Sequence, residues 1–116
     1  MIIRHFTDVK LIEAESGASG ASLRELITVR EGAPNFAMRL FEVAPGGSTP
    51  FHSHPWEHEV FVLDGLGAIG TVDGPRPVRG GDSVFIPGDE RHQFRNVGGE
   101  PLRFICVIPM QNPCDV

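Results

Sequence analysis

The sequence lacks a long apolar run, a basic cluster and a dense set of cysteines, and each absence excludes a class of protein. No run reaches about 18 apolar residues, so no membrane-spanning helix is expected. Ten lysines and arginines against fifteen acidic residues give a net charge of −5, which disfavours a nucleic-acid-binding face. Two cysteines, Cys106 and Cys114, are fewer than a small secreted domain usually carries. The first residues also lack a secretory signal pattern, so we expect a reduced, cytoplasmic protein.

Short apolar segments, separated by glycine and proline, run through the chain. No segment shows a 3.6-residue apolar period over ten or more residues, which disfavours helices. The segments have the usual length of strands, about 5–8 residues. Many short strands with turn signals between them predict an all-β sandwich or barrel. We expect strands at 24–30, 37–44, 59–63, 67–72, 83–87, 92–97 and 102–109.

The chain is predicted to form one domain, residues 1–116. Residues 1–30 are expected to be an N-terminal arm, with a further strand at 1–6 and a flexible loop at 15–22 by composition. The barrel itself is expected to span residues 35–110. A single barrel of this size has a sheet edge that must be covered.

Three of the five histidines lie within the seven residues HSHPWEH, at 52–58. His52 and His54 share one face of an extended strand, because side chains alternate along it. His92 lies in a later segment, and imidazole is a ligand for Zn, Cu, Fe and Ni. This pattern predicts a transition-metal site. Alternation alone leaves open whether His58 or its neighbour Glu59 takes part.

These spacings resemble the two motifs of the cupins, which are small β-barrels with a jelly-roll fold. The first motif, G-x5-H-x-H-x3,4-E-x6-G, is similar to residues 46–65. The second, G-x5-P-x-G-x2-H-x3-N, is similar to residues 81–96, except that Asp89 stands where the motif has a glycine. Aspartate tolerates a left-handed backbone better than most residues. The resemblance implies an all-β fold, a cupin-type double-stranded β-helix (jelly-roll) barrel.

The resemblance also implies a set of metal ligands. Counting back from Gly65 by the six-residue interval of the motif reaches position 58, a histidine in this chain. The chain then resembles the four-histidine subgroup of small cupins, in which the ligands correspond to His52, His54, His58 and His92. Manganese is usually associated with that subgroup, so Mn²⁺ is expected, with Fe²⁺, Zn²⁺, Ni²⁺ and Cu²⁺ as alternatives. Small cupins commonly dimerise by packing sheets and exchanging N-terminal strands, so a homodimer is expected.

Strand parity predicts the lining of a chamber beside this site. In the last segment the even-numbered residues oppose Arg103, which would be costly to bury unpaired, so the even face is expected to point inward. Phe94 shares a face with His92 in the same way. Parity does not place Arg39 or Trp56, which are added as candidates. The predicted substrate-binding residues are Phe94, Phe104, Cys106, Ile108, Arg39 and Trp56.

A site with four neutral ligands favours redox or Lewis-acid chemistry over simple proton transfer. It would leave two positions open on a six-coordinate ion, unlike a closed structural zinc site. We therefore predict an oxidoreductase of dioxygenase type that acts on a small, mostly apolar and uncharged organic substrate. The alternatives are an isomerase or lyase of a sugar or keto acid, and a non-catalytic small-molecule-binding module. Cupin folds host all three.

Overall fold

The structure, a computed structural model, describes residues 1–110 and is built almost entirely from antiparallel strands. Its helical segments within that range are two 3₁₀ turns, η1 (Phe6–Asp8) and η2 (Val29–Glu31). The predicted all-β barrel is confirmed. The strands are β1 (Leu11–Glu13), β2 (Ser19–Ile27), β3 (Phe36–Ser48), β4 (His58–Asp64), β5 (Leu66–Thr71), β6 (Gly74–Arg79), β7 (Ser83–Ile86), β8 (Gln93–Asn96) and β9 (Leu102–Pro109).

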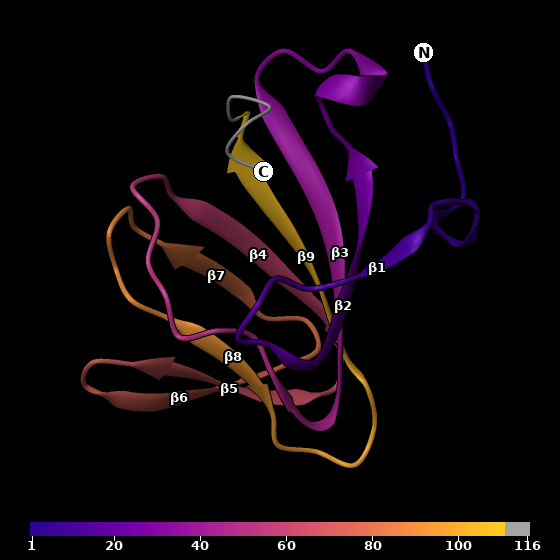
Figure 1. The fold of residues 1–116 in the computed structure, drawn as a ribbon. Helices are drawn as coiled ribbons and strands as arrows, with labels where there is room; N and C mark the ends of the chain where they lie inside the picture. The colour runs from indigo at the N-terminus through magenta and orange to yellow at the C-terminus, as the bar shows by residue number, and fades with distance from the viewer. Residues whose placement is uncertain (111–116) are drawn as a thin grey trace.

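One curled sheet carries these strands in the order β6-β5-β8-β3-β9-β4-β7, with β2 added along β3 and β1 along β2. Neighbours in the sheet are often distant in sequence, since β9 lies between β3 and β4. Figure 1 shows β2, β3, β9 and β4 side by side, with the β5–β6 hairpin and β8 below them. Such crossed pairing is typical of Greek-key and jelly-roll barrels. No helix in residues 1–110 has the length and apolar content to cross a membrane.

Strict alternation along the strands directs apolar side chains into the barrel. Along β9 the even-numbered residues are buried and the odd-numbered ones are half-buried, so the predicted inward face is confirmed. In β4 the first residue, His58, is buried together with Val60 and Val62, while Glu59 and Phe61 are exposed. The most deeply buried side chains of the described core are Val43, Val62, Leu102 and Phe104.

The first residues of the chain differ from the prediction. The strand expected at 1–6 is not formed: residues 1–5 have no regular secondary structure and η1 begins at Phe6. The His5 side chain caps this turn by accepting a hydrogen bond from the Thr7 backbone N–H at 3.3 Å. Local capping therefore decides the conformation here, because none of the η1 residues is buried.

Strand β2 also departs from the expected boundaries. It begins at Ser19, inside the segment 15–22 that was predicted to be a flexible loop, because Ala21 is buried in the core and β2 pairs along β3. The strand predicted at 24–30 ends at Ile27, since Thr28 and Glu31 form a capping box that starts η2. Composition indicated a loop throughout 15–22, and residues 15–18 do form one, but pairing with β3 makes residues 19–22 part of the sheet.

Strand β6 was missed because two of its six residues are prolines, Pro75 and Pro77. Proline cannot donate to a sheet ladder and is confined to edge strands and bulges. β6 ends the strand order of the sheet and pairs with β5, so it is an edge strand that tolerates both prolines.

Four motif positions have a left-handed backbone: Gly46, Gly65, Gly81 and Asp89. Asp89 has φ of 67°, as its glycine-equivalent position predicts, and its N–H donates to the His54 carbonyl at 2.6 Å. Gly65 has φ of 97°, and a Cβ atom there would lie 2.6 Å from the Pro101 carbonyl oxygen. The hydrogen bond from Asp89 to His54 links the two histidine-bearing segments.

Candidate metal centre

Backbone pairing brings the two histidine segments together. His52 and His92 form an isolated antiparallel bridge, with N···O distances of 3.1 and 2.9 Å in the two directions. The Asp89–His54 hydrogen bond lies beside it. His58 is the first residue of β4, and alternation turns its side chain into the barrel. The fold therefore fixes the position of each histidine by main-chain contacts.

The four imidazole rings form one cluster. The ring centroid of His52 lies 4.4 Å from that of His54 and 5.0 Å from that of His92. The ring of His58 lies 4.9 Å from His92 and 5.4 Å from His54, and the His54–His92 distance is 6.5 Å. All four residues predicted as ligands thus lie together, whereas Glu59 is exposed on the opposite face of β4. Their role as ligands stays a prediction.

Burial keeps three of the imidazoles, those of His52, His54 and His58, neutral. Burial and nearby positive charge lower the pKa of His58 to about 3. Burial also lowers the pKa of His52 and of His54, against an opposing effect of the Glu15 carboxylate. A lowered pKa leaves these rings unprotonated at neutral pH. Neutral imidazole is the form that binds a metal ion.

Oxygen acceptors orient two of the rings. The Nδ1 atom of His92 lies 2.9 Å from the Glu90 carbonyl oxygen, and the Nδ1 atom of His52 lies 3.0 Å from Oε1 of Glu15. A proton on Nδ1 that donates to these oxygens leaves Nε2 free, the usual arrangement of a metal-binding histidine. The Nδ1 atom of His58 is buried and has no hydrogen-bond partner within residues 1–110. These donors fit a divalent transition metal.

Glu15 is a site residue that the sequence did not predict. Its carboxylate and the ring nitrogens of His52 and His54 offer ligand atoms that all lie within 4.8 Å of one another, so these three form a candidate metal-binding cluster. Glu15 lies in the turn between β1 and β2 and reaches the histidines because β2 pairs with β3. Its segment was predicted to be a flexible loop, and no spacing in the sequence relates it to the histidines.

Three stacked phenyl rings form a wall beside the histidines. Phe94 lies 6.3 Å from the ring of His92 and stacks on Phe104 at 4.2 Å. Phe104 in turn stacks on Phe41, at 5.1 Å with the rings 8° from parallel. Phe41 was not among the predicted pocket residues. It shares the inward face of β3, because it is paired with Phe104 across the sheet.

The remaining predicted pocket residues also lie inside the barrel or at its mouth. Cys106 and Ile108 are buried on β9, and burial raises the pKa of the Cys106 thiol, which therefore stays protonated. Trp56 stacks on His54 at 4.6 Å with the rings 7° from parallel, and its indole N–H is buried without a partner in the described chain. The second cysteine, Cys114, lies outside the described residues.

Arg39 was not placed by parity, and the structure puts it on the inward face of β3. It is opposite Cys106 in the register, and its Nη2 donates to the Cys106 sulfur at 3.4 Å. The inward face of the barrel therefore carries a guanidinium group beside its apolar side chains.

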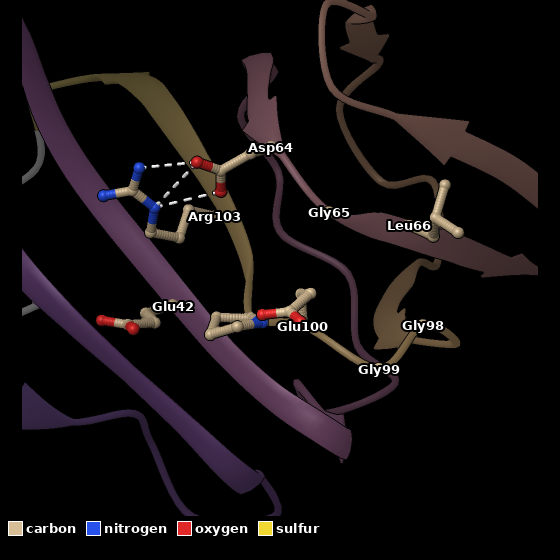
Figure 2. A pocket seen from close by; sticks show the side chains of 9 residues that line it. Glu42, Asp64, Gly65, Leu66, Gly98, Gly99, Glu100 and Arg103 are labelled. Carbon is tan, nitrogen blue, oxygen red and sulfur yellow. Dashed lines mark hydrogen bonds and ion pairs between the residues drawn. The ribbon is translucent and has the colours of Figure 1, made fainter.

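A pocket of about 600 Å³ lies on the outer face of the sheet and contains none of these histidines. Figure 2 shows the Asp64 carboxylate facing the Arg103 guanidinium beside Glu42 and Glu100. Two Arg103 nitrogens donate to Asp64, with Nη2 at 2.6 Å from Oδ2, and the hydrogen bond lowers the pKa of that carboxyl. This ion pair lies on the outward, odd-numbered face of β9, opposite the buried even-numbered residues.

Comparison with known proteins identifies relatives over most of the chain. The family model described as a cupin domain matches residues 39–108. The polyketide synthase CurC of Streptomyces cyaneus is 38% identical over 100 residues, which cover 84% of this chain and 64% of the relative. The oxalate-binding protein of Thermotoga maritima is 29% identical over 93% of each chain. The structure of the polyketide cyclase RemF from Streptomyces resistomycificus has a TM-score of 0.88 and 40% identity, over 97% of this chain and 82% of that one.

The lengths of these proteins differ. The chain spans less than two thirds of the first curated relatives that it matches, at 64% of each. It covers a larger share of the polyketide cyclase structure, and that likeness extends over nearly all of the present chain.

Proposed function

Since this chain belongs to the cupin family, we propose that it is a metal-dependent enzyme with His52, His54, His58 and His92 as ligands. The cluster of four imidazoles, with a partnerless, buried His58 nitrogen among them, supports this most directly. Manganese is the proposed ion, with iron, zinc, nickel and copper as alternatives that imidazole also binds. When bound, the ion would supply Lewis-acid or redox chemistry to a small oxygenated substrate.

We propose that the reaction closes a ring in a polyketide-like chain of carbonyl groups. The likeness to a polyketide cyclase over nearly the whole chain supports this reaction. Ring closure forms one carbon–carbon bond and moves one proton from carbon to oxygen, so it needs no oxidant. The stacked rings of Phe41, Phe94 and Phe104 suit an unsaturated, planar product and exclude water from it.

An oxidoreductase of dioxygenase type is the second candidate. It is favoured by the lack of a carboxylate among the four proposed ligands and by the phenyl wall beside His92. Such an enzyme would add both atoms of dioxygen to an unsaturated substrate or a β-dicarbonyl compound.

Metal exchange separates the two reactions. Protein stripped of metal and reloaded with zinc, manganese or iron is incubated with a synthetic linear triketone ester, and product mass and dioxygen uptake are measured. Ring closure predicts turnover with both zinc and manganese, no dioxygen uptake, and a product of unchanged mass or lighter by one water. A dioxygenase would be inactive with zinc, which has no redox chemistry, and its product would gain two oxygen atoms. No turnover with any metal would contradict both and favour a binding module.

We also propose that the protein works in the cytoplasm as a homodimer. The outer face of β4 and β7 carries exposed apolar side chains, with Phe61 48%, Leu63 38% and Phe85 61% exposed. Ile105 and Val107 of β9 continue this face as half-buried residues. An apolar sheet face of this kind is costly to leave in water and suits packing against a second copy.

Phe61→Glu is expected to convert the dimer into a monomer, because it places a charge in the proposed interface. Light scattering at micromolar concentration measures the change, and Val72→Glu serves as a matched control. Val72 is also exposed and apolar, at 72%, but follows β5 far from β4 in the strand order. A monomeric wild-type protein would contradict the proposed dimer.

A further inference from the structure

We propose that Arg39 binds an anionic oxygen of the substrate, a carboxylate or an enolate, inside the barrel. This role rests on the proposed function, because it takes the substrate to be a small molecule held beside the histidines. It also changes the expected substrate class from uncharged to anionic.

The guanidinium of Arg39 is held against apolar groups. Arg39 lies between Ala37 and Phe41 on the inward face of β3, and its Cζ atom is 5.0 Å from the centroid of the Phe41 ring. Its Nη2 donates to the Cys106 sulfur, which is a weak acceptor. The Nε atom is buried and has no partner within residues 1–110. The side chain is therefore fixed in position with donor capacity unused.

No carboxylate of the described chain neutralises this charge. The salt bridges among residues 1–110 do not include Arg39. Glu25 is its partner in the β2–β3 register, but Arg30 binds the Glu25 carboxylate. Arg39 is half-buried, and a cation beside apolar groups without a counter-charge costs free energy that a paired anion would reduce. The guanidinium thus lacks an anionic partner within residues 1–110.

A chain of ring contacts connects Arg39 to the histidine cluster. The Arg39 guanidinium lies over the Phe41 ring, Phe41 stacks on Phe104, and Phe104 stacks on Phe94, whose ring lies 6.3 Å from that of His92. Imidazole side chains add no negative charge, so a divalent ion held by them would make the inside of the barrel more positive. A guanidinium matches the two oxygens of a carboxylate through paired N–H donors. An anionic substrate would satisfy both groups at once.

A binding titration tests this role. Trp56 is the single tryptophan and stacks on His54, so its fluorescence reports on ligands in the chamber. Wild-type protein is titrated with benzoate and with benzamide, which has a similar shape and no charge. We expect tighter binding of benzoate, and Arg39→Gln should weaken benzoate binding on the order of 10- to 100-fold. The affinity of Arg39→Gln for benzamide should equal that of the wild-type protein.

Two variants serve as controls. Arg103→Gln removes an outer-face guanidinium and should leave benzoate binding unchanged. Arg39→Lys keeps the charge but loses the paired donors, so it should bind benzoate with intermediate affinity. Thermal unfolding shows whether Arg39→Gln folds. If it does not, Arg39→Lys alone tests whether the paired donors bind the carboxylate. Wild-type affinity for benzoate in Arg39→Lys would then contradict paired recognition.

Elemental analysis of the same samples separates this role from the metal centre. Metal content at the wild-type level in Arg39→Gln, with lost preference for benzoate, supports the proposal. Equal benzoate affinity in wild type and Arg39→Gln, or no preference for benzoate in wild type, would overturn it and leave the metal centre standing. A wild-type protein that prefers benzoate without binding metal would support the role of Arg39 and reject the proposed metal site.

Discussion

His58→Ala is expected to weaken metal binding by more than about 100-fold, the upper range for residues that only orient a ligand. His58 is buried, and its Nδ1 atom has no other partner in the described structure, so its loss removes a donor that nothing replaces. His54→Ala and His92→Ala should have similar effects. Bound metal is measured by elemental analysis after dialysis against metal-free buffer.

Glu59→Ala is the matched control for this prediction. Glu59 is the next residue along β4 and is exposed on the opposite face, so its removal should leave metal content unchanged. Thermal unfolding of each metal-free variant shows whether the fold survives the substitution. A larger loss of metal in Glu59→Ala than in His58→Ala would contradict the assignment, as would full occupancy in both His54→Ala and His92→Ala.

Phe104→Ala is expected to lower the free energy of unfolding by about 3–5 kcal/mol, the usual cost of emptying a buried phenylalanine site. Phe104 is 2% exposed and stacks on both Phe41 and Phe94, so its removal leaves a cavity between two strands and ends both ring contacts. Urea denaturation with linear extrapolation measures the change.

Phe36→Ala removes the same side chain from a position that is 64% exposed at the start of β3. It should cost less than about 1 kcal/mol, because little buried surface is lost. Equal destabilisation by the two substitutions would show that Phe104 is not part of a packed core.

The strands of the barrel could be predicted from the sequence where one face is buried. In β9 the alternation of apolar residues gave the inward face, and Arg103 confirmed it by pairing with Asp64 outside. The two prolines of β6 prevented its prediction as a strand, because a strand tolerates proline only where it lies at the edge of a sheet. Whether a strand lies at an edge depends on the order of strands in the sheet, which local composition does not determine.

The candidate site could be predicted where it depends on short spacings. His52 and His54 share a face by alternation, and the family interval selects position 58. Glu15 and Arg39 could not be placed in this way. Glu15 reaches His52 only through the pairing of β2 with β3, and the side of β3 that carries Arg39 depends on its register with β9. Both are consequences of contacts between residues far apart in sequence.

Anomalous X-ray diffraction from crystals of the metal-loaded protein, recorded at the absorption edge of the bound metal, tests the four-histidine centre most directly. The account predicts one strong peak about 2.1 Å from a nitrogen of each of His52, His54, His58 and His92. A peak coordinated by Glu15, His52 and His54 without His58 and His92, or no peak inside the barrel, would contradict it.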